Sequence, residues 1–336
     1  MTEVALSIVS IHLGGTQTKK TAVVRASVSL SRILSGIPPG AEHKQFATAI
    51  HKWFPNIPCE PLNTGTSSKR SAPLLWMAHI RDIGATSRCD SDTNLIHTLS
   101  NTTEANIICI NAPLSLPPCT TCSEETCSGP EHCTQSNCLL MHKEWLNLRA
   151  NKEKKIRIPQ TYTDRYFDFF CRHHLDHPAL MSTHDFEPIL GSGRAPLTMR
   201  ALHIKKRLKA IFPNALFLET NTAIAAMGWA LFCGYQPRKM DHFRQDLESP
   251  TIRASILRRL ENKHLAVRGA GFHQMLYLEF AEHHETFLAA MGALSAWGLL
   301  NGEAYVSQEF QSQNPTDPFN GWSIIPKEIA DRAWEQ

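Results

Sequence analysis

Five cysteines in one short segment are the strongest chemical signal in the sequence. They are half of the ten cysteines in the chain and lie within CTTCSEETCSGPEHCTQSNC. This segment places Cys119, Cys122, Cys127, Cys133 and Cys138 in the pattern C-x2-C-x4-C-x5-C-x4-C. A gap of two residues lets two thiolates bind one metal ion, and later cysteines can complete a tetrahedron. Because the N-terminal residues lack the pattern of a secretory signal, this density favours metal ligation over a disulfide framework.

Zinc is the first expectation for these cysteines, since thiolate-rich structural sites most often hold it. An iron–sulfur cluster uses the same four thiolates and remains open as an alternative, as does a reduced loop without metal. Five thiols are one too many for a four-ligand site, and Cys138 is the best candidate for the spare one. His132 is a possible substitute ligand. The polar residues between the cysteines cannot form a core, so residues 117–145 are interpreted as an excursion that a metal would stabilise.

Elsewhere in the chain, four segments place polar side chains at the ends of apolar stretches. An apolar strand reaches His12 just before a Gly-rich turn, in IHLGGTQT. The buried run NIICINAPL contains Asn111, and the run ALFLET contains Glu219. The late segment HHETFLAAMGALSAW carries Glu285 at the start of a nearly all-apolar helix. Its content of Ala and Gly predicts that this helix is buried and packs closely against a sheet.

The order of these segments predicts an α/β fold with a central mixed β-sheet flanked by helices. β-Branched and apolar runs predict strands over 4–13, 21–29 and 74–80, within the run NIICINAPL at 106–114, and over 215–220. We expect residues 1–336 to form a single domain. Residues 33–72 are rich in Pro, Gly, Ser and Thr and are predicted to be a loop-rich insertion.

Several of these segments together resemble a family of predicted RNase-H-like nucleases that is classed as a domain of unknown function. INAPLSLPP is similar to one motif of that family, and YTDRYFD and LGSGRAPLTMRALHIKKRL resemble its middle portion. LFLETNTAIAAMGW is similar to a strand-to-helix segment, and DPFNGWSIIP to the closing strand. The resemblance implies an RNase-H-like fold, in which acids at two central strand ends and on a later helix converge on divalent metal ions.

The acidic positions of that family are altered in this chain. Transferred residue by residue, the two strand-end acids become His12 and Asn111, and the two helix acids become Glu285 and Leu288. Of the implied site, Glu219 and Glu285 still carry a carboxylate. Two-metal cleavage of phosphodiesters needs several carboxylates to hold a pair of Mg²⁺ ions, so the loss of acids should weaken such a site severely.

Two hypotheses follow for this altered site. In the first, His12 and Asn111 are neutral replacements in a catalytically degenerate domain that binds nucleic acid or another protein. In the second, His12, Asn111, Glu219 and Glu285 form a rebuilt site for Mn²⁺, Fe²⁺ or Zn²⁺ in an active phosphodiesterase, because imidazole and carboxylates suit those ions. The number of lost acids favours the first hypothesis.

Charge and hydropathy limit the classes of partner that the protein is expected to bind. A formal net charge of +3 is too small to indicate nucleic acid or membrane binding by itself. The basic helix RALHIKKRLK offers Arg200, Lys205 and Lys206 as candidate phosphate contacts, although a solvated charged face is the plainer interpretation. The longest apolar run is shorter than the roughly 20 residues that span a bilayer. We therefore expect a cytoplasmic protein with no membrane contact.

Overall fold

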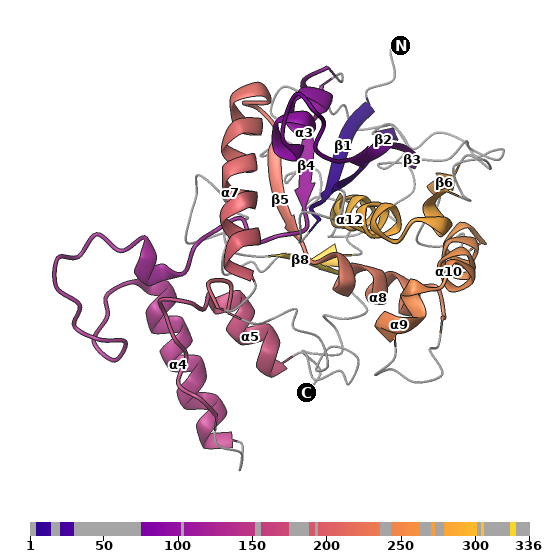
Figure 1. Cartoon of the computed structure of the whole chain (residues 1–336). Helices are drawn as coiled ribbons and strands as arrows, with labels where there is room; N and C mark the ends of the chain where they lie inside the picture. Colours follow the sequence, from indigo (N-terminus) through magenta and orange to yellow (C-terminus); the bar gives the residue numbers. More distant parts are fainter. Residues whose placement is uncertain are drawn as a thin grey trace, which may run out of the picture.

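The computed structural model places the apolar runs in strands and helices around one large sheet (Figure 1). It describes residues 5–14, 21–29, 75–101, 104–151, 156–174, 188–191, 194–235, 243–262, 270–272, 279–300, 304–305 and 323–326. The predicted loop-rich insertion at 33–72 lies outside these residues.

Within the described residues, eight strands form the sheet. They are β1 (Ala5–His12), β2 (Thr21–Ser29), β3 (Leu75–Ile83), β4 (Ile107–Ile110), β5 (Leu216–Thr220), β6 (Ala270–Phe272), β7 (Ala304–Tyr305) and β8 (Ser323–Pro326). Their order is β6-β3-β2-β1-β4-β5-β8-β7. The five strands predicted from the sequence correspond to β1 to β5, with ends that differ by at most a few residues.

The sheet is mixed, and its centre is parallel. Strands β1, β4, β5 and β8 run parallel to one another, in that order. Strand β2 lies antiparallel between β1 and β3, β6 joins β3 in parallel, and β7 joins β8 antiparallel. The carboxyl ends of β1, β4 and β5 therefore meet at one edge of the sheet.

Helices cover both faces of this sheet. They are α3 (Ser91–Ser100), α4 (Ser136–Asn151), α5 (Tyr166–His174), α7 (Arg194–Ile211), α8 (Thr222–Phe232), α9 (Phe243–Glu248), α10 (Pro250–Asn262) and α12 (His284–Leu300). One buried cluster joins the sheet to α8, α10 and α12, and another joins it to α3 and α7. The predicted α/β architecture, a mixed sheet flanked by helices, is confirmed.

The alternation of side chains along β1 explains why it lies at the centre. Leu6 and Ile8 belong to the cluster under α12, whereas Val9 and Ile11 belong to the cluster under α3 and α7. Successive side chains of a strand point to opposite faces, so a strand covered on both faces needs apolar residues at nearly every position. This alternation carries on to His12, which points to the same face as Ile8.

Two glycines let α12 lie directly against its neighbours. A Cβ atom at Gly292 would come within 2.5 Å of the Ser10 hydroxyl oxygen, and one at Gly298 within 2.7 Å of the Trp229 ring. Phe287 and Trp297, near the two ends of the helix, are both buried. The predicted buried helix, packed closely on the sheet, is confirmed.

The cysteine-rich segment and α4 extend to one side of the sheet (Figure 1). A short 3-10 helix, η1 (Pro118–Thr120), begins the excursion, and irregular chain connects it to α4. The backbone N–H of Cys119 donates to the carbonyl oxygen of Thr161 (3.2 Å). The start of the excursion is therefore joined to the chain that follows α4. Within the described residues, no helix has both the length and the apolar character needed to cross a membrane.

The close packing of α12 gives a stability prediction. Gly298→Ala should lower the free energy of unfolding by about 1–2 kcal/mol in denaturant titrations, because overpacking against the rigid Trp229 ring outweighs the roughly 1 kcal/mol gain in helix propensity. Gly292→Ala should cost less, because the Ser10 hydroxyl can rotate, and Ser10→Ala should relieve that cost. A stabilised Gly298→Ala protein would contradict this packing.

Candidate functional site

A cleft of about 390 Å³ opens at the carboxyl ends of β1, β4 and β5. The four residues predicted for the altered site, His12, Asn111, Glu219 and Glu285, all line it, as does Leu288. Parallel strands bring His12, Asn111 and Glu219 to one edge, and the first turn of α12 brings Glu285. The sequence-predicted positions are therefore neighbours in space, and their functional role remains a prediction.

His12 and Asn111 satisfy each other at the ends of β1 and β4. The Asn111 side-chain carbonyl accepts the backbone N–H of Leu13 (2.6 Å). The Asn111 amide nitrogen consequently faces His12 Nδ1 at 2.7 Å, and the Thr222 hydroxyl lies 3.2 Å from the same nitrogen. An amide NH₂ can only donate, so His12 Nδ1 accepts and the neutral ring carries its hydrogen on Nε2. The pair forms a closed hydrogen-bonded unit where the family would place two acids.

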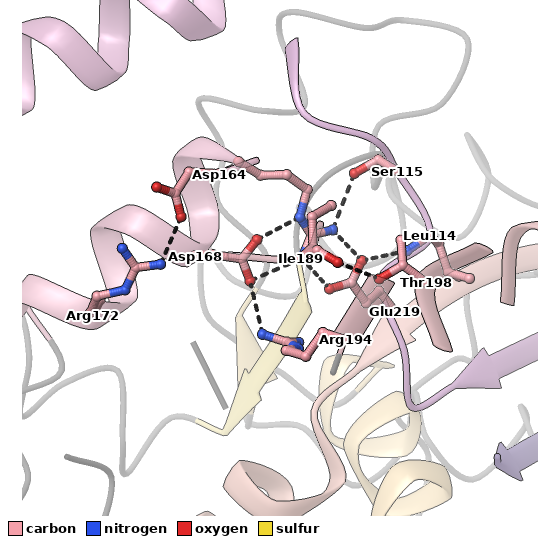
Figure 2. A network of polar contacts seen from close by, with 10 residues as sticks. Leu114, Ser115, Asp164, Asp168, Arg172, Ile189, Arg194, Thr198 and Glu219 are labelled. Carbon is pink, nitrogen blue, oxygen red and sulfur yellow. Dashed lines mark hydrogen bonds and ion pairs between the residues drawn. The ribbon is translucent and has the colours of Figure 1, made fainter. Parts of the chain in front are cut away.

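Glu219 is bound by an arginine that sequence reasoning did not single out. Arg165 Nη1 lies 2.6 Å from Glu219 Oε2, and Nη2 lies 2.7 Å from Oε1. The same guanidinium reaches Asp168 through Nε, at 2.6 Å from Oδ2. Figure 2 shows Glu219 and Asp168 on either side of this guanidinium, with Arg194 next to Asp168. We call Arg165, Asp168 and Glu219 the ion triad.

The ion triad lies out of contact with water. Arg165, Asp168 and Glu219 are 3%, 1% and 4% exposed. Burial alone would lower the pKa of the Arg165 guanidinium, but the neighbouring Asp168 and Glu219 carboxylates raise it above its usual value. The charge on Arg165 is thus fixed by two opposite charges at hydrogen-bond distance. Such a bidentate arrangement is the strongest form of arginine–carboxylate pairing.

Backbone and hydroxyl groups complete the triad. The backbone N–H of Leu114 donates to Glu219 Oε2 (2.8 Å), and Arg165 Nη1 donates to the Ser115 hydroxyl oxygen (3.1 Å). The chain just after β4, the start of α5 and the end of β5 are therefore joined at one point. Both oxygens of Glu219 accept hydrogen bonds from Arg165, so a metal ion bound to Glu219 would lie close to the positive guanidinium and be repelled by it.

Glu285 reaches the cleft from the start of α12. It is half-buried, and its charge acts on Arg253. Burial lowers the pKa of Arg253, and Glu285 partly offsets that effect. Arg253 donates to the carbonyl oxygens of Ala281 (2.6 Å) and Glu282 (2.7 Å), and so fixes the chain that leads into α12.

The basic residues predicted to contact nucleic acid do not form one exposed patch. Arg200 binds Asp92 at 2.5 Å and donates to the Gly14 carbonyl oxygen at 2.7 Å. Lys205 is half-buried with its amine 3.4 Å from the Leu114 carbonyl oxygen, whereas Lys206 is exposed. Arg200 thus has a structural role, and nucleic-acid binding by this helix remains a prediction.

The five clustered cysteines are placed unevenly. Cys138 is 1% exposed, and its sulfur lies 3.9 Å from that of Cys119. Cys127 is exposed, and Cys122 and Cys133 are half-buried. Cys138 is thus the innermost of the five, and the expectation that it is the spare thiol remains a prediction. Spacing alone could not reveal this, since it depends on how α4 packs.

None of the cysteines within the described residues forms a disulfide. In the same part of the chain, no group of three or more His, Cys, Asp or Glu side chains is arranged to hold a metal ion. Zinc or an iron–sulfur cluster at the cysteines, and a divalent metal at the altered acidic site, therefore remain predictions.

Comparisons with protein-family models, with curated proteins and with solved structures gave no match.

The ion triad gives a second stability prediction. Arg165→Met leaves two buried carboxylates without their cation and should lower the free energy of unfolding by about 3–5 kcal/mol. Adding Glu219→Gln should recover part of this loss, because it removes one of the two charges. Arg258→Met, at an exposed position of α10, is the matched control and should change stability by about 0.5 kcal/mol or less. Equal effects at both arginines would show that the triad is not formed.

Proposed function

We propose that this protein is a catalytically degenerate RNase-H-like domain that acts by binding a partner. The observation that carries the proposal is the Arg165 guanidinium bound to both oxygens of Glu219. A fixed internal cation stands where the family resemblance implies an exchangeable metal ion. The RNase-H-like assignment is supported by the layout of the cleft, with site positions at the ends of β1 and β4 and on the later helix α12.

The side chains at the altered positions support the proposed loss of catalysis. Phosphodiester cleavage by two metals requires cations about 3.5–4 Å apart, held by carboxylates that also neutralise charge on the displaced oxygens. Here one carboxylate is paired with Arg165 through both of its oxygens, and the two strand-end positions carry an imidazole and an amide that are hydrogen-bonded to each other. Of the positions that the resemblance implies, Glu285 is the one carboxylate outside the ion triad, and a single carboxylate is a poor ligand set for Mg²⁺, which prefers several oxygen ligands.

The charge of the cleft argues against nucleic acid as its occupant. Among the residues that the structure describes, carboxylates outnumber guanidiniums by four to two at the cleft, and a polyanion gains affinity where cations neutralise its phosphates. The residues counted are Asp168, Glu219, Glu248 and Glu285 on one side, and Arg194 and the underlying Arg165 on the other. We therefore infer that the partner is a protein that offers a neutral or cationic group to this cleft.

One observation favours a second candidate function. His12, Asn111, Glu219 and Glu285 all reach the same cleft, as a phosphodiesterase that uses Mn²⁺, Fe²⁺ or Zn²⁺ would need. In that case Arg165 would have to leave Glu219 when the metal binds. We rank this candidate second, because leaving would break two hydrogen bonds of 2.6 and 2.7 Å in a buried site.

Nuclease assays separate the two candidates. With Mg²⁺, the purified protein should not cleave single-stranded or double-stranded DNA, RNA or an RNA–DNA hybrid above the level of a Glu219→Gln variant, and Mn²⁺ should not change this result. The variant serves as the control for contaminating nuclease. Cleavage by the wild-type protein that disappears in the variant would overturn the proposal, and a requirement for Mn²⁺ would favour the second candidate.

A further inference from the structure

Two thiols of the excursion meet where its irregular chain begins and ends. Cys138 lies in the first turn of α4, and Cys119 lies on η1 at the base of the excursion. Their sulfur atoms are 3.9 Å apart. The Cys133 thiol is an electrostatic neighbour of Cys138. The chain between η1 and α4 therefore folds back so that both of its ends meet at one buried sulfur.

The separation of the two sulfurs suits a shared metal ion better than a disulfide. Zinc–sulfur bonds of about 2.3 Å in a tetrahedron place neighbouring sulfurs about 3.8 Å apart. A disulfide instead requires about 2.05 Å. The observed 3.9 Å between Cys119 and Cys138 is thus close to one edge of a zinc–thiolate tetrahedron.

The surroundings of Cys138 and Cys119 hold the two sulfurs in place. A helix N-terminus stabilises negative charge, and Cys138 occupies the third position of α4. Arg157 and Cys119 line the same cavity, so a guanidinium lies near the cluster. The Cys119 sulfur is further fixed by the Thr161 hydroxyl at 3.0 Å. These contacts position two sulfurs before any ion arrives.

We propose that the excursion binds one Zn²⁺ ion through Cys119, Cys122, Cys133 and Cys138, and that Cys127 is not a ligand. Cys122 is the fourth ligand because two intervening residues let it reach the ion that Cys119 binds. Cys127 is excluded because it is the exposed member of the five. This site is separate from the cleft and independent of the function proposed for it.

The ion itself completes the site. The described side chains do not form a full ligand group, and residues 123–128 are exposed without regular secondary structure. Metal binding to such a segment contributes directly to its folding, so the fourth ligand need not be in place beforehand. Zinc would thereby fasten η1 to α4 close to Ser115 and Arg165, which are linked at 3.1 Å.

Metal analysis of the full chain tests the ligand assignment. Purified without chelators, the wild-type protein should contain one zinc per chain by mass spectrometry of its elements. The Cys138→Ser and Cys133→Ser variants should contain much less than half of the wild-type zinc per chain. The Cys127→Ser variant should retain the full amount. Cys89→Ser, a half-buried cysteine outside the excursion, is the matched control and should also retain it.

A spectroscopic measurement covers the case in which a ligand variant does not fold. Co²⁺ exchanged into the wild-type and Cys127→Ser proteins should give the same tetrahedral, thiolate-rich absorption spectrum. Three results would overturn the proposal. They are loss of zinc in Cys127→Ser, a Cys119–Cys138 disulfide with no bound metal in non-reducing peptide mapping, and iron with inorganic sulfide in place of zinc.

Discussion

The buried guanidinium of Arg165 links the segments that form the cleft at the edge of the sheet. Arg165 binds Glu219 at the end of β5 and Asp168 in α5, and it also reaches Ser115 just after β4. Two charges of one sign buried so close together would be strongly unfavourable without the opposite charge between them. The architecture of the cleft therefore requires Arg165. Because Arg165 is paired with Glu219, we propose that Glu219 does not act as a metal ligand.

The ion pair between Glu219 and Arg165 explains why the neighbouring strand-end residues His12 and Asn111 are neutral. Once an internal cation neutralises Glu219, a second cation nearby would be repelled, and acids at the ends of β1 and β4 would have no counterion. Instead, the Asn111 amide donates to His12 Nδ1, and the Asn111 side-chain oxygen accepts the backbone N–H of Leu13. This pairing explains why an imidazole stands where a carboxylate is expected, since buried polar groups at strand ends need hydrogen-bond partners.

Local sequence patterns predicted the strands and the meeting point of the site, but not its chemistry. Apolar, β-branched runs such as 21–29 define β2, and parallel strand ends had to bring His12 and Asn111 together. Arg165 could not be found this way, because its partner Glu219 is 54 residues away and a charged residue in YTDRYFD resembles a surface position. The pairing of Arg200, a predicted phosphate contact, with Asp92 could not be predicted for the same reason, since the two residues are 108 positions apart.

Electron paramagnetic resonance of free Mn²⁺ tests most directly whether Arg165 replaces the metal ion. With the cysteine site first loaded with Zn²⁺, Mn²⁺ is titrated into the wild-type protein, into Arg165→Met and into Arg165→Met with Glu219→Gln. We predict no tight binding by the wild-type protein, binding by Arg165→Met because its two carboxylates are uncovered, and loss of that binding in the double variant. Tight Mn²⁺ binding by the wild-type protein that disappears with Glu219→Gln and Glu285→Gln would contradict the account.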